Sequence, residues 1–204
     1  MATALHEERL EAVVGHLLAS GARRVLDLGC GEGELLQRLA PHAQFDRLVG
    51  IDIDHGALAV ARQVLWSAGV NGRTEVRFGS FDVSDPEWVG FDAATLIETI
   101  EHLDPRRLSR VEAAVFANMA PTTVLVTTPN SEYNPLYGLA PGQVRHPGHR
   151  FEWTRAKFMQ WARGVARRNT YTVRFFGVGP SDSLRGSTTQ LARFVRHATG
   201  SSDC

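Results

Sequence analysis

Apolar residues recur along the chain with two different periods, which alternate several times between the ends. Over residues 6–19 they fall every three or four positions, with Leu10, Val13 and Leu17 among them. This spacing places them on one stripe of a helix, so we expect an amphipathic helix at the start of the chain. Two further helical patterns follow, one through Leu35, Leu36 and Leu39 and one over residues 57–68.

Short apolar runs with the length of buried strands separate these helical patterns. Because strands that alternate with helices pack as a parallel sheet covered by helices, the pattern predicts a doubly wound α/β fold. Two late segments instead alternate apolar and polar residues, which predicts a closing pair of strands. The expected buried strands are residues 24–28, 48–52, 74–78, 91–97 and 122–127, and the closing pair is residues 171–176 and 190–195.

The segment from residue 129 to residue 155 connects the fifth strand to a last helix. Residues 129–148 contain several prolines and glycines and are too long for an ordinary connection. Connections of this length in compact domains are usually functional or disordered. Thr154 is a suitable N-cap, so we expect the last helix to begin at Arg155.

Composition limits the class of protein but does not identify a partner. The 204 residues, 43% of them hydrophobic, are enough for one buried domain, and Lys+Arg and Asp+Glu are both 22. Residues 145–174 nevertheless carry eight basic side chains against the single acid Glu152. Such a segment is equally compatible with binding a phosphate backbone and with a solvated helix face. The eight are Arg145, Arg150, Arg155, Lys157, Arg163, Arg167, Arg168 and Arg174.

Cysteine usage and hydropathy bear on the compartment. Cys30 and Cys204 make no plausible disulfide framework, which indicates a reducing environment. No apolar run is long enough to span a bilayer, and the first residues contain early acids rather than a signal peptide. We therefore expect a cytoplasmic protein that has no membrane partner.

A glycine-rich loop, Asp-Leu-Gly-Cys-Gly-Glu-Gly at residues 27–33, joins the first strand to the following helix. Glycines there permit a tight turn and let the backbone approach a ligand closely. The Gly-x-Gly-x-Gly spacing differs from the dinucleotide fingerprint, which favours a nucleotide-like cofactor without a phosphate. Asp52, about twenty residues further on, ends the second strand, where a carboxylate can accept both ribose hydroxyls.

Three groups able to bind a metal follow the fourth strand. Glu98, Glu101 and His102 have the spacing i, i+3, i+4, which would place them on one helical face, and His149 could join them from a distant loop. Two carboxylates with two imidazoles suit Mn²⁺ or Mg²⁺, with Fe, Co or Zn also possible. Taken singly, each of these residues would more simply be a solvated helix start or a surface histidine.

The motifs "VLDLGCGEG" and "GIDID" resemble those of class I S-adenosylmethionine-dependent methyltransferases. The resemblance implies a Rossmann-like, seven-stranded, mostly parallel sheet with helices on both faces and an antiparallel last strand. It also implies one methyltransferase catalytic domain over residues 1–204, as the C-terminal part of a longer protein. The residues implied to bind the cofactor are Asp27, Gly29, Cys30 and Gly31 at its methionine end, Asp52 and Ile53 at the ribose, and Ser80, Phe81 and Asp82 beside the adenine.

Three further motifs, "IETIEHLD", "VTTPNSEYNPL" and "RHPGHRFEWTR", resemble the small-RNA 3′-terminal 2′-O-methyltransferase family. This resemblance implies that Glu98, Glu101, His102 and His149 bind the metal. His146 is not required by the eukaryotic pattern, and we expect it to contact the substrate or to transfer a proton. The resemblance further implies a terminal-nucleotide pocket and, for a bacterial member, an RNA-repair polynucleotide kinase–phosphatase as partner. The pocket residues would be Thr128, Pro129, Asn130, Tyr133 and Asn134.

The expected reaction is metal-dependent 2′-O-methylation of the last ribose of an RNA, for repair or for protection of its 3′ end. A metal that binds both vicinal hydroxyls would lower the pKa of the 2′-hydroxyl and select chain ends, while a histidine takes the 2′ proton. Two alternatives share the same scaffold. One is a metal-dependent O-methyltransferase of small catechol-like molecules, and the other is a non-catalytic RNA-binding module.

Overall fold

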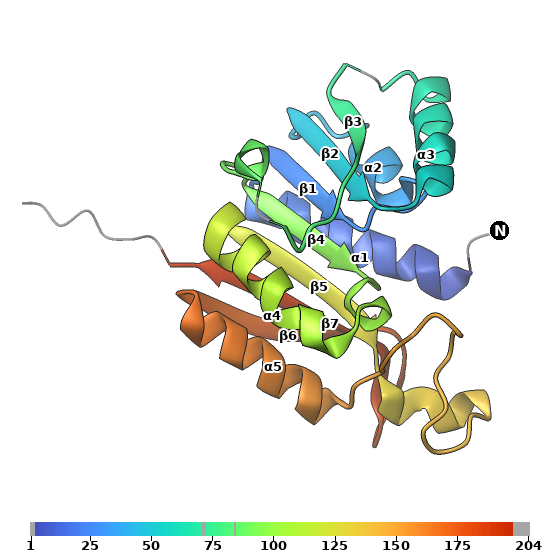
Figure 1. Cartoon of the computed structure of the whole chain (residues 1–204). Helices are drawn as coiled ribbons and strands as arrows, with labels where there is room; N and C mark the ends of the chain where they lie inside the picture. The colour runs from blue at the N-terminus through green and yellow to red at the C-terminus, as the bar shows by residue number, and fades with distance from the viewer. Residues whose placement is uncertain (1–2, 71, 84, 198–204) are drawn as a thin grey trace, which may run out of the picture.

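A computed structural model of the chain describes residues 3–70, 72–83 and 85–197. Its seven strands form one sheet in the order β3-β2-β1-β4-β5-β7-β6 (Figure 1). Strands β1 to β5 pair in parallel, whereas β7 runs antiparallel to both β5 and β6. This confirms the predicted sheet with its antiparallel end. The strands are β1 (Arg24–Leu28), β2 (Arg47–Asp52), β3 (Thr74–Phe78), β4 (Ala93–Ile97), β5 (Thr123–Pro129), β6 (Tyr171–Asp182) and β7 (Gly186–Arg196).

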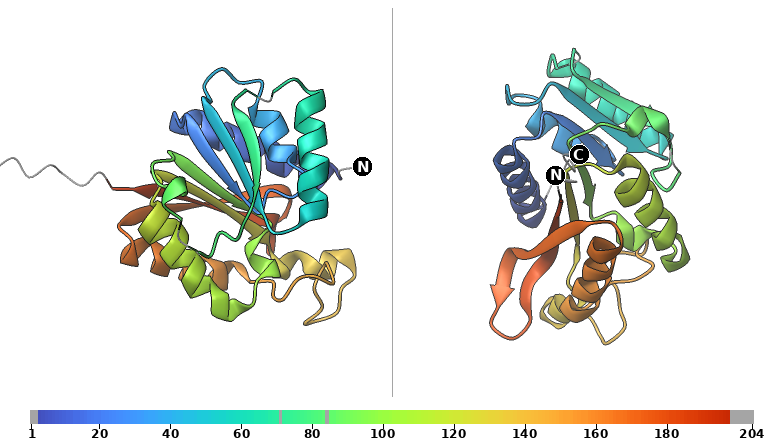
Figure 2. Two further views of the ribbon diagram at one scale, coloured as in Figure 1. Left: turned by 45° about the horizontal axis from the view of Figure 1, so that its top comes forward. Right: turned by 90° about the vertical axis from the view of Figure 1, so that its left-hand side faces the viewer.

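Helices cover both faces of the sheet, as the sequence predicts (Figures 1 and 2). On one face lie α1 (Ala4–Ser20), α2 (Glu34–Leu39) and α3 (His55–Ser67). The other face carries α5 (Arg155–Arg168) and α4 (Leu108–Val111), which continues as a π-helix over Glu112–Met119. Thr3 caps α1 and Thr154 caps α5, because each side chain accepts a hydrogen bond from a backbone N–H in the first turn of its helix.

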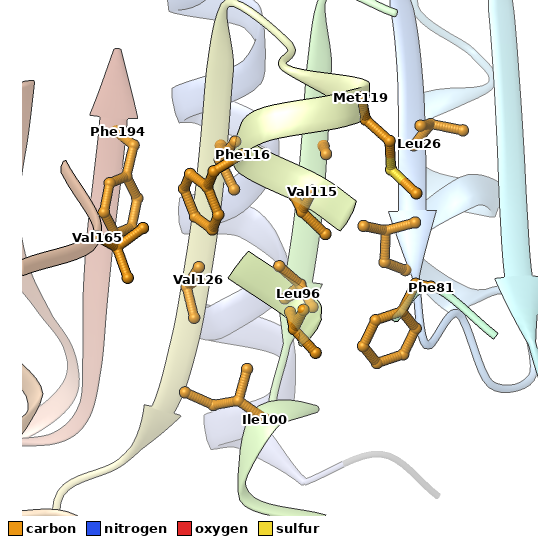
Figure 3. Packing of buried hydrophobic residues seen from close by; sticks show 14 of the residues in the cluster. Leu26, Phe81, Leu96, Ile100, Val115, Phe116, Met119, Val126, Val165 and Phe194 are labelled. Atoms are coloured by element: carbon orange, nitrogen blue, oxygen red, sulfur yellow. The ribbon is translucent and has the colours of Figure 1, made fainter. Parts of the chain in front are cut away.

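Each face has its own hydrophobic core. Beneath α4 and α5, Phe116 lies between the sheet and the π-helix, with its ring centroid 4.8 Å from that of Phe194 on β7 (Figure 3). Beneath α1, α2 and α3, Leu17, Leu36 and Leu58 are fully buried against the other face. Burial on both faces explains why the central strands are continuous apolar runs rather than alternating ones.

Some local structure differs from the sequence prediction. The two closing strands are longer than the alternating segments predict, because they form a long hairpin that continues past residue 176. The segment 129–148 is partly regular, since it contains the last residue of β5 and a 3₁₀-helix, Ser131–Tyr137. Shorter 3₁₀-helices at Pro86–Trp88, Ile100–His102 and Pro105–Arg107 lie in the connections around β4.

The structure bears on the predicted absence of a membrane span and on the two cysteines. No helix within the described residues is long and apolar enough to cross a membrane. Cys30 is a free, buried cysteine, while Cys204 lies outside the described residues.

Candidate functional site

The glycine-rich loop is held against the end of β2 by its backbone. The N–H groups of Gly29 and Cys30 donate to the Ile51 carbonyl at 2.8 and 3.1 Å, and Gly31 N–H donates to Asp52 Oδ2 at 2.8 Å. Gly29 has a φ of +82°, and a Cβ there would lie 2.6 Å from Thr99 Cγ2. Only glycine therefore fits at this point of the turn.

A cavity of about 210 Å³ lies directly above this loop. Its walls come from the glycine-rich loop, the start of α2 and two residues of α1, His6 and Leu10. Of the residues predicted to bind the methionine end of the cofactor, Asp27, Gly29, Cys30 and Gly31 all line it. The structure thus brings these four together, and it adds the two α1 residues, which no motif marks.

Asp27 has an unusual protonation environment at the base of this cavity. It is 3% exposed, and burial, with a contribution from the charge of Asp52, raises its pKa to about 7 despite a hydrogen bond from Thr95. Burial likewise raises the pKa of the Cys30 thiol, so this cysteine is not a nucleophile.

The other predicted cofactor residues lie at the neighbouring strand ends. Asp52 accepts from Gly31 and, through Oδ1, from Asp54 N–H at 2.9 Å, whereas Ile53 is 63% exposed. Phe81 and Asp82 are both buried. Although burial opposes it, hydrogen bonds from Ser80 and Arg107 hold the pKa of Asp82 below its usual value. Asp82 therefore anchors the segment after β3 to the start of α4.

Glu98 does not lie on a helix, so the prediction of one helical face for the metal residues is wrong. It follows β4 in the left-handed region, with a φ of +50°. The conformation is imposed by distant partners, because Thr127 on β5 both accepts from Glu98 N–H and donates to Glu98 Oε1, each at 3.0 Å. Arg9 on α1 forms an ion pair with Glu98 Oε2 at 3.2 Å.

Glu101 and His102 follow in a single 3₁₀ turn and point in different directions. Glu101 is fully buried, and its Oε2 accepts from Thr128 at 3.1 Å. Its Oε1 is buried without a hydrogen-bond partner among the described residues. Burial and the nearby charge of Glu98 raise the pKa of Glu101 well above its usual value. His102 lies on the exposed side of the turn.

The loop of residues 146–149 brings two more imidazoles to His102. One ring nitrogen from each of His102, His146 and His149 lies within 4.8 Å of the others. His102 Nδ1 is 3.2 Å from the Gly148 carbonyl, and His149 Nδ1 is 2.6 Å from Glu152 Oε1. Since both partners only accept, each Nδ1 carries hydrogen, which leaves Nε2 of both rings with a free lone pair.

His146 has the opposite arrangement. Its Nδ1 accepts the N–H of Gly148 at 3.0 Å, so in the neutral ring the hydrogen is on Nε2. Nε2 of His146 can donate to a substrate oxygen, but it cannot ligate a metal in this tautomer. For His146 to accept a proton on Nδ1, the hydrogen bond from Gly148 must first break.

Glu152 organises this loop and was not singled out from the sequence. It is almost completely buried and accepts hydrogen bonds from Asn134, from Arg145 N–H and from His149 Nδ1. A carboxylate that fixes the Nδ1 hydrogen of a histidine is typical of the outer ligand layer of metal sites. The only signal in the sequence was its position three residues after a candidate ligand.

The donor set fits a divalent cation. Nε2 of His102 and of His149 are free to bind, and the buried Oε1 of Glu101 has no other partner in the described part of the chain. Because burial and the charge of Glu98 raise the pKa of Glu101, a bound cation would stabilise its ionised form. Glu98 also forms an ion pair with Arg9.

A second cavity, of about 530 Å³, adjoins Glu98 and His149 on the side away from the glycine-rich loop. Of the five residues predicted to shape a nucleotide pocket, Pro129 lines it. Asn130 and Asn134 are instead buried and hydrogen-bonded to the surrounding backbone and to Glu152. The remaining walls were not predicted, because they come from residues far apart in the chain: Thr3, Leu5 and Arg9 of the N-terminal segment, and Tyr137, Leu139 and Arg145.

The chain matches known methyltransferases over most of its length. Residues 26–125 match the family model of a methyltransferase domain. Over 98% of its length the chain is similar, at 36% identity, to the small RNA 2′-O-methyltransferase of Xenopus tropicalis, of which it covers 57%. The chain spans about half the length of the curated vertebrate relatives that it matches.

Two solved structures are similar in both sequence and fold. The methyltransferase domain of bacterial CtHen1 is 41% identical with a TM-score of 0.84, and the match covers 94% of this chain and 99% of that one. The small RNA methyltransferase HEN1 is 31% identical with a TM-score of 0.88, and the match covers all of this chain and 28% of that one.

Proposed function

The chain belongs to the Hen1 family of small-RNA 2′-O-methyltransferases, and on this basis we propose that it methylates the 2′-hydroxyl of the 3′-terminal ribose of an RNA. S-adenosylmethionine is the methyl donor. The observation that carries the proposal is the convergence of His102, His146 and His149, whose ring nitrogens lie within 4.8 Å of one another, beside the cavity that His149 and Glu98 line.

The donor occupies the cavity over the glycine-rich loop. Asp27 and the loop from Gly29 to Gly31 contact its methionine end, and the Asp52 carboxylate accepts hydrogen bonds from its ribose hydroxyls. Ile97 ends β4 at this cavity and Glu98 begins the second one, so a methyl group leaving the first cavity faces the second.

The acceptor nucleoside occupies the second cavity, with its ribose toward Glu98 and His149. The 2′ oxygen forms a bond to the methyl carbon while the bond from that carbon to sulfur breaks, which leaves S-adenosylhomocysteine. His146 donates from Nε2 to an oxygen of the substrate. Because His102 and His146 are exposed, the hydroxyl proton can pass to water, either directly or through a histidine as the sequence suggests.

We propose that His102, His149, Glu98 and Glu101 hold a divalent cation, Mn²⁺ or Mg²⁺. When bound, such an ion supplies Lewis-acid stabilisation of the developing alkoxide. Glu152 holds the imidazole of His149 with Nε2 directed away from it, and Thr128 holds one oxygen of Glu101. Because Arg9 forms an ion pair with Glu98, binding of the ion would weaken or break this pair.

A radiolabel transfer assay tests the proposal. The protein is incubated with labelled S-adenosylmethionine, Mn²⁺ and RNA oligonucleotides that end in a free diol, a 2′-deoxy, a 3′-deoxy or a 3′-phosphate terminus. Label is expected only on the RNA with both hydroxyls, and only with added metal. If a catechol is supplied in a parallel reaction, label on the catechol but on no RNA would favour the small-molecule enzyme. RNA binding without cofactor and without any methyl transfer would favour a non-catalytic module.

An RNA-repair role and a polynucleotide kinase–phosphatase partner follow from the family resemblance alone and stay predictions. Co-purification of the two proteins from cells that encode both is the measurement that tests the partnership.

A further inference from the structure

Two tryptophans line a groove on the face of the sheet that carries α4 and α5. Its volume is about 420 Å³, and it lies between the start of α4 and the outer face of α5, two helices that lie side by side on one face of the sheet (Figures 1 and 2). Pro105 and Leu108 form one wall, and Trp153, Lys157 and Trp161 form the other.

Both walls of the groove lie close in sequence to the candidate metal residues. One wall follows His102 by three residues and the other follows His149 by four. The two segments lie side by side at their starts, because Arg150 N–H donates to the Glu101 carbonyl at 2.7 Å. The segments that lead from the candidate metal residues into the two walls therefore meet at one backbone hydrogen bond, which places the groove next to the site at which the last ribose of a substrate would be held.

The aromatic rings form a stepped series along this path. Phe151 stacks on Trp153 with centroids 4.4 Å apart, and Trp153 lies 5.6 Å from Trp161. Both tryptophans are only partly buried, and both line the groove. Their inner faces stabilise the core under α5, and their remaining surface is available for stacking a planar ligand.

The charge of the groove suits a polyanion. Its acid, Glu112, is neutralised by an ion pair with Arg168 at 2.7 Å and also accepts a hydrogen bond from Asn169 Nδ2 at 2.8 Å. Lys157 and Arg150 are exposed, and neither side chain forms an ion pair within the described residues. Lys157 also lies in the first turn of α5, which contains no acid. A helix N-terminus favours acidic side chains, so this lysine is not placed there to stabilise the helix.

Together these features resemble a single-strand binding track, where cations follow the backbone and aromatic rings stack the bases. We propose that this groove binds the nucleotides that precede the 3′ end of a single-stranded RNA. Trp153 and Trp161 stack bases, and Lys157 and Arg150 contact phosphates. This inference rests on the proposed function, because the terminal ribose fixes the start of the track.

The test measures RNA binding by fluorescence anisotropy, with a 5′-labelled single-stranded decanucleotide that ends in a free diol. Lys157→Glu is compared with Arg167→Glu, which makes the same charge change on the same helix outside the groove. We expect Lys157→Glu to weaken RNA binding by about tenfold. The slope of log affinity against log salt concentration should also fall by about the contribution of one phosphate contact. Arg167→Glu should change the affinity by less than about twofold.

A second readout tests stacking directly. RNA binding should quench tryptophan fluorescence, and an abasic oligonucleotide of equal length should not. Trp153→Phe, which keeps a ring against Phe151, should reduce the quenching. Equal effects of the two charge variants, or quenching by abasic RNA, would overturn the groove assignment even if the protein methylates RNA. Failure of the wild type to methylate any RNA would instead overturn the proposed function.

Discussion

Replacement of Asp27 by asparagine should remove a specific pH dependence from the stability of the cofactor-free protein. Asp27 is buried, and its pKa is about 7 in the folded state against 3.8 for an ordinary aspartate. Between these values the folded protein holds a proton that the unfolded chain releases. The free energy of unfolding must therefore fall as the pH rises through this window.

The magnitude follows from the two pKa values. Their difference corresponds to about 4 kcal/mol of lost stability above pH 7, at about 1.4 kcal/mol for each pH unit. An asparagine at this position would not titrate, and its Oδ1 could still accept the hydrogen bond that Thr95 Oγ1 donates at 2.8 Å. The stability of Asp27→Asn relative to the wild type should therefore increase by about 3 kcal/mol between pH 5 and pH 8.

Urea unfolding followed by circular dichroism, at pH 5, 6, 7 and 8 without cofactor, measures this difference. Asp54→Asn removes an exposed carboxyl and keeps the cap of α3, so it controls for loss of a charge alone. If the difference between Asp27→Asn and the wild type stays constant across this range, the buried, protonated Asp27 inferred here is incorrect.

Three further substitutions test other parts of the structure. Glu152→Gln should weaken Mn²⁺ binding by about 10- to 100-fold in calorimetry, because His149 loses the carboxylate that orients it. An unchanged Mn²⁺ affinity would contradict this role of Glu152. Gly29→Ala should destabilise the protein by about 1–3 kcal/mol and weaken S-adenosylmethionine binding, because φ is +82° and the new Cβ would clash with Thr99. Normal S-adenosylmethionine binding in equilibrium dialysis would argue against the assignment of this loop to the cofactor. Phe116→Ala should lower the unfolding free energy by about 3–5 kcal/mol in urea, and a loss below about 1 kcal/mol would mean that the π-helix does not pack as described.

The elements that the sequence predicts well are those whose pattern is local. Central strands such as residues 24–28 are continuous apolar runs, and the Thr154 cap marks the start of α5 within one residue. The glycine-rich loop was predictable for the same reason, since its spacing reflects a single turn between one strand and the next helix, and Asp52 was predictable because it ends the next strand of a regular strand–helix–strand unit.

The features that the sequence could not give depend on distant partners. Glu98 adopts a left-handed conformation because Thr127, on another strand, binds both its backbone and its side chain, so helical spacing was the wrong guide. Arg9 reaches Glu98 from the first helix, far away in the sequence, and no local pattern marks it. The tautomer of His146 likewise depends on the fold of its loop around Gly148.

The basic segment shows the same limit. Arg145 is part-buried and hydrogen-bonded to Asn130, Asn134 and Thr188, and Arg155 pairs with Glu132, so these two charges support the loop rather than form a basic surface. Lys157, which lines the groove, and Arg150 remain exposed. A charge count could not separate these two groups, because burial and pairing decide which cations can meet a phosphate.

The position of the transferred methyl group tests the central claim most directly. A 3′-terminal ribose with both hydroxyls free is cleaved by periodate, whereas a ribose methylated on the 2′ oxygen is not. RNA treated with the protein, S-adenosylmethionine and Mn²⁺ should become resistant to periodate, and digestion to nucleosides should place the methyl group on the last ribose. RNA that carries the methyl group on a base or an internal ribose, and stays sensitive to periodate, would contradict the account.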